Sequence, residues 1–562
     1  MDKKIEQTYL AWLNEPALTA EEKLELKNII TNEEEIMSRF GSTLEFGTGG
    51  LRGIMGLGTN RMNRFVVRRA TQGLANHLNK KKKHGNVVAI GYDSRNNSHA
   101  FAFEAANVLA ANGIKVYIYT ELMPTPAVSY AVRYHHCDAG IVVTASHNPA
   151  KYNGYKVYGA DGAQLNLEDS EKVIKEVLAV DIFKDVKSGN FDKFVLNGTI
   201  NFIDEDLIRD YFESTKKTAL RNEEKIIKLT YTPLHGAGIR CVTTTLRELG
   251  YAPDVVTEQS LPNGDFPTCP YPNPEIKEAL KLGIDLMLKN KNDILMATDP
   301  DSDRCGVVVN QKGKPIILTG NEVGILLFDY IYQTKKELGT LRENSIVVKT
   351  IVSSDLVDIM AEKYGVTVKS VLTGFKFIGE QIKILESAGE ADRYLLGFEE
   401  SCGYLTNPDV RDKDAVNACL LVAEMANHYK HLGKTLYDRL QEIYKEFGDY
   451  KTVTIAFDVP GLDYKEKISN IMEEFRGGKV NDLFGEVDHI GDYQKGLITF
   501  KDHEEETGLP KSNVIKLFLA TKETITARPS GTEPKIKFYI FARGEKGVEK
   551  YNAIIDKYMA SN

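Results

Sequence analysis

The chain has 562 residues, of which 42% are hydrophobic and 27% are charged, and its formal net charge is −8. This is the composition of an ordinary globular protein, and the length exceeds what one hydrophobic core supports, so we expect three or four domains. The negative charge argues against nucleic-acid binding, and no apolar stretch is long enough to span a bilayer. The N-terminus lacks the pattern of a secretion signal, and the six cysteines lack the paired spacing of a disulfide framework or zinc site. We therefore expect a cytoplasmic protein.

The chain begins with a predicted helix. Thr19 and Glu22 form a capping-box pattern, and Leu26, Ile29 and Ile30 continue one apolar face after it.

A glycine-rich segment, Glu45 to Gly53, comes next. It holds four glycines in seven residues, so backbone amides can approach an anion, and Arg52 can bind a phosphate with its guanidinium fork. The spacing differs from the dinucleotide-binding fingerprint, because the third glycine is displaced and no βαβ unit contains it. We expect a loop here, with Arg52 as a candidate functional residue.

Strands and helices then alternate. The expected elements are a helix over Val67–Leu78, a strand at Val87–Tyr92, a helix over Phe101–Asn112, a strand at Ile114–Tyr119, a helix from about Ala127 and a strand at Ala139–Val143. This alternation predicts a mostly parallel sheet with helices on its faces.

The segment Thr144–Pro149 follows the last of these strands. A serine at the carboxyl end of a buried strand stands where α/β sheets place reactive groups, and the Asn-Pro pair predicts a turn that leaves Ser146 on a loop. A nucleophilic hydroxyl needs a proton acceptor and electrostatic support. His147 and Lys156 are candidates for both roles.

The same alternation recurs twice more and suggests a repeated domain. The second block has strands at Ile227–Tyr231 and Asp293–Thr298, with helices over Ile239–Leu249 and Pro274–Lys289; the third begins near Lys314 and has strands at Ser345–Ile351, Val366–Leu372 and Tyr394–Phe398, with a long helix over Asp414–Tyr429.

The segment Asp299–Arg304 follows a buried strand of the second block. Its three carboxylates at alternate positions, Asp299, Asp301 and Asp303, can converge on one hard divalent cation. The calcium EF-hand pattern does not fit, because Arg304 stands where that loop needs glycine. Three oxygen ligands suit Mg²⁺, and Arg304 is a candidate ligand for a substrate phosphate.

Three further loops carry polar groups suited to a sugar phosphate. Glu399 and Ser401 lie between glycines after a strand, as hydrogen bonding to sugar hydroxyls requires. The loop from Arg528 to Lys535 combines arginine with small polar residues, a pattern typical of an anion-binding nest. Lys376 adds a cation on a loop after another strand.

The composition changes after about Gly448. Grouped strands at Thr452–Phe457, Val514–Leu519, Thr524–Ala527 and Ile536–Ala542, with a closing helix over Val548–Met559 and a loop from Lys501 to Lys511, predict a smaller α+β domain. The expected fold class is α/β, with three similar mixed or parallel α/β sheet domains plus this C-terminal α+β domain around one central cleft. The predicted domains are 1–203, 204–313, 314–445 and 446–562.

This combination of loops resembles the α-D-phosphohexomutase superfamily from Arg52 to Lys535. Thr144–Pro149 is similar to its phosphoserine loop, Asp299–Arg304 to its metal loop, Glu399 with Ser401 to its sugar loop and Arg528–Thr532 to its phosphate loop. Residues 46–53 and 397–400 most resemble the phosphoglucomutase/phosphopentomutase branch. The phosphomannomutase pattern carries a histidine where this chain has Gly403.

The resemblance implies interconversion of glucose 1-phosphate and glucose 6-phosphate through a phosphoserine enzyme and a bisphosphorylated sugar. It implies Mg²⁺ as cofactor, a sugar bisphosphate (glucose 1,6-bisphosphate) as activator, and small-molecule sugar phosphates as partners, with neither nucleic acid nor membrane. The implied catalytic residues are Ser146, His147, Lys156 and Arg52; the substrate ligands are Arg304, Lys376, Glu399, Ser401, Arg528, Ser530, Gly531 and Thr532; the metal ligands are Asp299, Asp301, Asp303 and phosphorylated Ser146.

Several alternatives stay open at this point. The substrate could be a pentose phosphate or, with less support, mannose phosphate. Lys156 and His147 both remain candidates for the general acid/base. A haloacid-dehalogenase-like phosphatase would use Asp299 as its nucleophile, and a catalytically silent sugar-phosphate sensor would show no turnover.

Overall fold

The computed structural model describes residues 2–46, 50–461, 463–530 and 534–561. The chain divides into two compact units. The first unit comprises Met1–Gly320, Phe375–Tyr394 and Ser401–Thr435; the second comprises Asn321–Gly374, Leu395–Glu400 and Leu436–Asn562. None of the helices described is long and apolar enough to cross a membrane. All six cysteines are buried free thiols.

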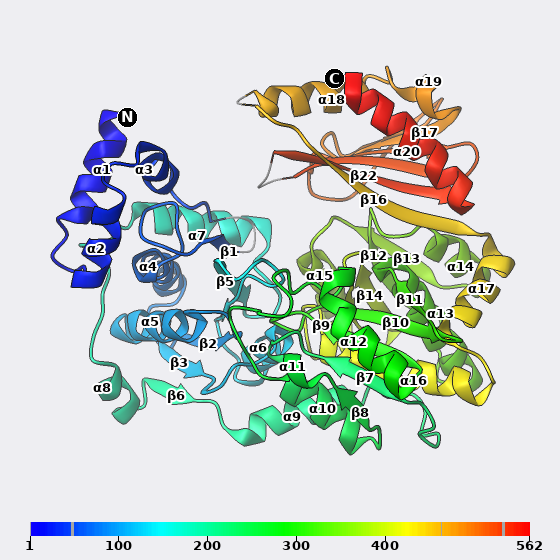
Figure 1. The fold of residues 1–562 in the computed structure, drawn as a ribbon, viewed down its shortest axis with the longest axis horizontal. Coiled ribbons are helices and arrows are strands. Elements are labelled where there is room, and N and C mark those ends of the chain that lie inside the picture. Colours follow the sequence, from blue (N-terminus) through cyan, green and yellow to red (C-terminus); the bar gives the residue numbers. More distant parts are fainter. Residues whose placement is uncertain (1, 47–49, 462, 531–533, 562) are drawn as a thin grey trace. The chain divides into compact units, whose positions relative to one another are not determined.

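Three helices open the first unit and lie beside α4 (Figure 1). They are α1 (Lys3–Leu13), α2 (Ala20–Asn28) and α3 (Glu33–Phe40), and Trp12 packs edge-on against Phe40 and against Phe65 of α4. The predicted capping box at the start of α2 is confirmed. The helix ends at Asn28. Ile29 still packs against the cluster that holds Leu26, as predicted, but Ile30 is 55% exposed, so its place on the apolar face was wrong.

The first sheet has six strands in the order β1-β5-β4-β2-β3-β6. The strands β2, β3, β4 and β6 run parallel, whereas β5 is antiparallel to both of its neighbours, β4 and the edge strand β1. The strands are β1 (Gly50–Ile54), β2 (Val87–Tyr92), β3 (Lys115–Ile118), β4 (Ala139–Val143), β5 (Tyr152–Gly159) and β6 (Ile200–Phe202); the helices are α4 (Arg64–Lys81), α5 (Ser98–Ala111), α6 (Thr125–Tyr134), α7 (Leu167–Ala179), α8 (Phe191–Leu196) and α9 (Glu205–Lys216).

Strand β1 lies where the sequence predicted a loop, and strand β5 carries Lys156. The described end of the predicted glycine-rich loop is strand β1, in which Arg52 pairs with Gly154 of β5. Lys156 stands on β5, which returns antiparallel to β4. Gly154 is required there, because an added Cβ would lie 2.4 Å from the Thr144 carbonyl oxygen and 2.8 Å from that of Leu51. Residues 47–49 of the predicted loop lie outside the described residues.

The second sheet also belongs to the first unit and has the order β11-β10-β9-β7-β8. Its parallel strands are β7 (Leu229–Thr232), β8 (Pro253–Val255) and β9 (Ile294–Thr298), its antiparallel strands are β10 (Cys305–Gln311) and β11 (Lys314–Leu318), and its helices are α10 (Gly238–Glu248), α11 (Thr257–Ser260) and α12 (Lys277–Asn290). The sheet therefore extends to Leu318.

The third sheet contains β13 (Thr367–Val371), β12 (Ile346–Thr350) and β14 (Tyr394–Glu399) side by side. Its three predicted strands are confirmed. Helices of the second unit here are α13 (Gly320–Glu337), α14 (Leu356–Tyr364) and α17 (Leu436–Phe447); α15 (Phe375–Ser387), η1 (Ala391–Arg393), β15 (Gly403–Leu405) and α16 (Ala415–His431) belong to the first unit. The predicted long helix is α16, and Asp414 caps it by accepting bonds from Val416 and Asn417 amides.

The fourth sheet, in the second unit, is antiparallel and has the order β16-β22-β21-β20-β17-β18-β19. Its elements are β16 (Tyr450–Asp458), α18 (Tyr464–Arg476), α19 (Asn481–Phe484), β17 (Val487–Asp492), β18 (Leu497–Thr499), β19 (Glu504–Glu506), β20 (Ile515–Leu519), β21 (Thr524–Pro529), β22 (Lys535–Arg543) and α20 (Gly544–Ser561). Helices α18 and α20 pack on one face (Figure 1). The predicted α+β character is confirmed, although the expected loop at 501–511 contains β19.

Candidate active site

The reactive serine lies on a tight turn at the carboxyl end of β4. All five residues of β4 are buried, so the strand is fixed in the sheet and its end is held in place. Ser146 has a φ of 51°, and its amide donates to the Thr144 hydroxyl at 2.8 Å. A non-glycine residue in the left-handed region is strained unless its surroundings hold it. This strained turn directs the serine side chain toward the end of β9.

Ser146 contacts a carboxylate and an imidazole. Its hydroxyl donates to Asp299 Oδ2 at 2.8 Å, and its Oγ lies 3.2 Å from His147 Nδ1. Burial lowers the pKa of His147 well below its usual value, and the nearby Arg304 and Arg52 guanidinium groups lower it further. The imidazole is therefore neutral at physiological pH and can accept a proton.

The three aspartates converge beyond β9, whose residues are all buried. Asp299, Asp301 and Asp303 are at most 1% exposed, and each offers a carboxylate oxygen within 4.8 Å of the others. The Oδ1 atoms of Asp301 and Asp303 are buried and accept no hydrogen bond from any residue that the structure describes. Burial raises the pKa of Asp299 well above its usual value, and repulsion from Asp303 and Asp301 raises it further. Such a cluster is stable as anions only with cations beside it.

Two lysines supply that positive charge. Lys156 Nζ lies 2.7 Å from Asp301 Oδ2 and 3.2 Å from Asp303 Oδ2. Lys413 Nζ lies 3.2 Å from Asp303 Oδ2. Burial opposes the charged form of Lys156, but Asp301 and Asp303 outweigh it and raise its pKa. For Asp303 burial acts upward, while Lys413 and Lys156 bring its pKa far below the usual range.

A buried arginine holds the backbone of the serine turn. Arg95 donates from Nη1 to the carbonyls of Pro149 at 3.0 Å and Tyr152 at 3.1 Å, and from Nη2 to the carbonyls of Ser146 and Asn148. Its side chain is 0% exposed.

Asp93 supports the same turn through contacts with Arg95 and Thr144. Its Oδ2 lies 3.3 Å from Arg95 Nε and accepts a bond from the Thr144 hydroxyl at 2.6 Å. Its Oδ1 accepts bonds from Ser98 Oγ and the Arg95 amide. The pair therefore links strand β2 to the turn that carries Ser146.

The two arginines that the sequence did predict in the first unit, Arg52 and Arg304, lie near this cluster. Arg52 on β1 donates from Nη1 to Asn148 Oδ1 at 3.0 Å, which brings it to the serine turn. Arg304 pairs with Glu275 at 2.9 Å, and its amide donates to Asp299 Oδ1. The structure thus brings Arg52, Arg304 and the serine and aspartate loops together.

Residues of the predicted sugar and phosphate loops belong to the second unit. In the second unit, Glu399 ends β14 and accepts a bond from the Gly374 amide at 2.8 Å. Arg528 lies on β21, and its Nη1 donates to the Tyr539 hydroxyl of β22 at 3.3 Å. The Ser530 amide donates to the Lys535 carbonyl. Gly531 and Thr532 lie outside the described residues.

Besides Arg304, two predicted substrate ligands belong to the first unit. Ser401 lies in a turn after β14. Lys376 lies in the first turn of α15 and not on a loop as expected. It lines a polar cavity of about 440 Å³ with Asp161 and Gln164. Burial lowers the pKa of Lys376 to about 8, with Glu380 opposing the shift.

Sequence reasoning missed Lys413, Asp93, Arg95 and Thr125. Thr125, at the start of α6, donates to Asp301 Oδ2 at 2.8 Å. Asp93 and Arg95 follow strand β2, so the strand-end rule that identified Ser146 applies to them too. Lys413 stands in a charged run just before α16, which gave a weaker signal.

Comparisons with known proteins identify the family to which the chain is similar. Family models described as phosphoglucomutase/phosphomannomutase alpha/beta/alpha domains I, II and III match residues 43–182, 209–313 and 319–447. A phosphoglucomutase of Staphylococcus saprophyticus is 38% identical over 512 residues, which are 90% of this chain and 92% of its own. One from Staphylococcus aureus (strain MSSA476) is 36% identical over 546 residues, covering 94% and 96%.

Solved structures show the same fold at lower identity. The phosphoglucomutase pp63/parafusin from Paramecium, in its open form, has a TM-score of 0.69 and 19% identity, covering 92% of this chain and 94% of its own. A phosphoglucomutase/phosphomannomutase family protein from Burkholderia thailandensis has a TM-score of 0.68 and 17% identity, covering 92% and 98%. With the sequence matches over most of its length, the chain belongs to the phosphoglucomutase/phosphomannomutase family of the α-D-phosphohexomutase superfamily.

Proposed function

We propose that this protein is a phosphoglucomutase that interconverts glucose 1-phosphate and glucose 6-phosphate through a phosphoserine enzyme and a bisphosphorylated sugar. The observation that carries the proposal is the 2.8 Å contact between Ser146 Oγ and Asp299 Oδ2. It joins a nucleophilic hydroxyl to a cluster of three buried carboxylates, the two parts that phosphoryl transfer needs at one place. The Staphylococcus relatives named phosphoglucomutase support the same reaction.

The residues present fit a magnesium ion. Two buried carboxylate oxygens, Asp301 Oδ1 and Asp303 Oδ1, lack hydrogen-bond partners within the described part of the chain, and hard oxygen donors suit Mg²⁺. Asp299, Asp301 and Asp303, with the phosphate on Ser146, would hold it. When bound, it would supply positive charge to the phosphoryl oxygens. An N-acetylphosphoglucosamine mutase from Aspergillus fumigatus, with a TM-score of 0.50, was solved with GlcNAc-6P and magnesium.

The chain's own side chains perform the remaining work of transfer. Arg52 and Arg304 provide guanidinium groups near Ser146 that offset charge on the phosphoryl oxygens. His147, which is neutral and 3.2 Å from Ser146 Oγ, is one candidate for the general acid/base toward the sugar hydroxyl. Lys156 stays protonated beside Asp301 and is the second candidate for the acid/base role toward the sugar hydroxyl.

Recognition of the sugar and its distal phosphate falls to the other predicted loops. Glu399 and Ser401 form hydrogen bonds to the sugar hydroxyls. The distal phosphate is held by Lys376 and by the phosphate-loop residues Arg528, Ser530, Gly531 and Thr532. The Gly403 position supports glucose over mannose phosphate. An added Cβ there would lie 2.1 Å from Lys413 Cδ, so the histidine of the phosphomannomutase pattern does not fit while Lys413 holds its place.

The wider assignment follows the family. We propose four domains at 1–203, 204–313, 314–445 and 446–562, glucose 1,6-bisphosphate as activator, and a cytoplasmic location, which six free thiols support.

The decisive test is a coupled mutase assay with glucose 1-phosphate or ribose 1-phosphate, with and without added sugar bisphosphate. The proposal predicts a higher kcat/KM for glucose 1-phosphate and a requirement for the bisphosphate. A higher kcat/KM for ribose 1-phosphate would instead identify a phosphopentomutase, and absence of turnover with either would contradict a mutase.

A further inference from the structure

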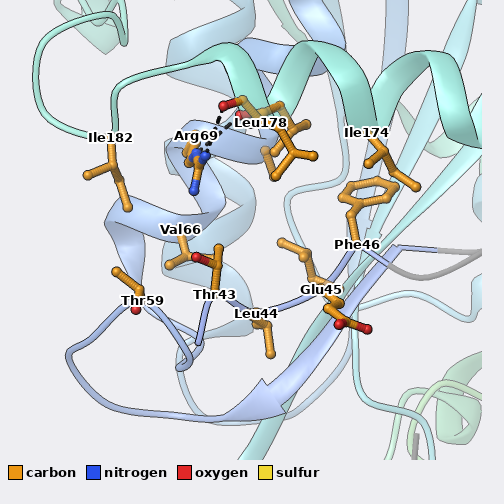
Figure 2. Close-up of a pocket in the computed structure, with 13 residues that line it drawn as sticks. Thr43, Leu44, Glu45, Phe46, Thr59, Val66, Arg69, Ile174, Leu178 and Ile182 are labelled. Atoms are coloured by element: carbon orange, nitrogen blue, oxygen red, sulfur yellow. Dashed lines mark hydrogen bonds between the residues drawn. The ribbon is translucent and has the colours of Figure 1, made fainter. Parts of the chain in front are cut away.

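A second cavity lies in the first unit, lined by none of the proposed active-site residues. It has a volume of about 440 Å³ and lies between the segment leading to β1 and the helices α4 and α7 (Figure 2). Most of its lining is apolar, including Phe46, Leu51, Val66 and Ile174. Small-molecule sites in proteins have volumes of about 300–1,000 Å³ and predominantly apolar walls with a few polar groups. This cavity has those properties.

The cavity contains one cation, Arg69 of α4. Its Nε donates to the carbonyls of Val177 at 3.1 Å and Val180 at 3.0 Å, and its Nη2 donates to that of Leu178 at 3.3 Å. These bonds give Nε and Nη2 a structural role, because they satisfy carbonyls at the end of α7. Nη1 has no hydrogen-bond partner among the described residues. In Figure 2 the dashed bonds of Arg69 all run to the α7 side, and the rest of the guanidinium faces the cavity.

Arg69 has no counter-ion in place. The described residues place no carboxylate within the 4.0 Å ion-pairing distance of its guanidinium. Glu45 also lines the cavity, but it is exposed and its carboxylate points away from Arg69 in Figure 2. Burial lowers the pKa of Arg69, with Asp181 opposing the shift from a distance. A half-buried guanidinium in apolar surroundings attracts an anion that brings apolar surface with it.

We propose that this cavity binds a small amphipathic carboxylate, with the carboxylate on Arg69 and an unbranched or aromatic apolar body against Phe46, Val66 and Ile174. Arginine suits a carboxylate because its planar fork matches the two oxygens. The apolar body is required because the walls offer few polar partners. A sugar phosphate has neither feature, so this site differs in ligand class from the proposed active site.

The protein carries its own reporter for this site. Trp12 is the single tryptophan, and it packs edge-on against Phe65 at 5.6 Å and Phe183 at 5.0 Å. The next residue after Phe65 and the one before Phe183 are Val66 and Ile182, which both line the cavity. Occupation of the cavity should therefore shift the Trp12 emission.

The test is a titration of the full chain with octanoate, followed by calorimetry and by Trp12 fluorescence. Three comparison ligands are used. Octylamine is a cation of the same chain length, and octanol is its neutral counterpart. Acetate has the carboxylate but lacks the long chain. We expect saturable octanoate binding with a fluorescence change, and weaker binding of all three comparison ligands. Absence of saturable binding below the micelle concentration, or equal binding of octylamine, would overturn the proposal.

Variants on α4 locate the binding. Arg69→Gln should weaken octanoate about tenfold to a hundredfold, the usual value of a charged hydrogen bond. Arg69→Lys keeps the positive charge but lacks the planar fork, so its loss of affinity should lie between that of Arg69→Gln and none. Arg68→Gln is the matched control, because Arg68 is the neighbouring residue but pairs with Glu104 and lines no part of the cavity. Equal octanoate affinity in Arg69→Gln and the wild type would contradict the site. Thermal unfolding of each variant distinguishes lost binding from lost folding.

Discussion

The serine–aspartate region of the first unit and the Glu399–Arg528 region of the second hold their polar groups in different ways. In the first, Asp299, Asp301 and Asp303 are at most 1% exposed and lie among lysines and backbone amides. In the second, Glu399 is also buried and accepts a bond from the Gly374 amide, but Arg528 is half-buried and donates to the Tyr539 hydroxyl at 3.3 Å. Groups that stabilise developing charge act best when their positions are fixed before the reaction, whereas groups that recognise a substrate must stay accessible to it. The contrast separates the proposed chemistry from the proposed recognition.

The largest expected effect is at the aspartate cluster. Asp301→Asn removes one charge from the proposed metal site and breaks the ion pair with Lys156, so kcat should fall by about 100- to 1000-fold. Steady-state mutase assays with a magnesium titration measure this loss. Asp285→Asn is the control, because Asp285 forms an exposed ion pair with Lys281 on α12. Full activity of Asp301→Asn in excess chelator would rule out the metal role.

Arg95 tests whether the first region depends on its fixed backbone. Arg95→Lys keeps a positive charge beside Asp93 but cannot bond four carbonyls, and each lost charged bond costs about 1.5–3 kcal/mol. We expect the rate of Ser146 phosphorylation by sugar bisphosphate to fall about tenfold to a hundredfold. Rapid-quench assays measure it, and Arg68→Lys is the matched control. An unchanged rate with a lowered melting temperature would show that Arg95 serves folding alone.

Arg528 tests the recognition region. Arg528→Ala should raise the KM for glucose 1-phosphate about tenfold, with kcat changed less, because a lost phosphate contact weakens ground-state and transition-state binding alike. Arg528→Lys should restore part of the affinity. A fall in kcat at constant KM would instead place Arg528 with the groups that stabilise developing charge.

Lys376 gives the smallest expected effect and refines the comparison, because it is a predicted recognition residue within the first unit. Its pKa is lowered to about 8, so it loses its charge as the pH rises through that value. The KM for glucose 1-phosphate should then rise by about twofold to fivefold between neutral pH and about pH 9. Lys376→Arg stays charged and should flatten this rise. The same pH profile in both proteins would contradict the phosphate contact.

The sequence predicted the buried strands well because each is a short apolar run between turn residues. The strands at Val87–Tyr92 and Ala139–Val143 have the predicted bounds. The strands β1 and β5 escaped prediction because they contain glycines and polar residues, and long-range pairing rather than local propensity forms them. For the same reason Arg52 was expected on a loop and lies on a strand.

The site shows the same division. Ser146 and the three aspartates follow apolar strands, so their convergence could be predicted from strand ends. Lys413 and Thr125 lie far from them in the chain, and only the folded structure shows that they contact Asp303 and Asp301. Charge balance required cations near three carboxylates, but no local pattern identified Lys413 as one.

One measurement tests the central claim most directly: the site of phosphorylation after incubation with sugar bisphosphate labelled in its phosphates. Tandem mass spectrometry should find the label on Ser146, and Ser146→Ala should acquire none while keeping the wild-type melting temperature. Label on Asp299 would support the phosphatase alternative, and normal labelling of Ser146→Ala would contradict the phosphoserine mechanism.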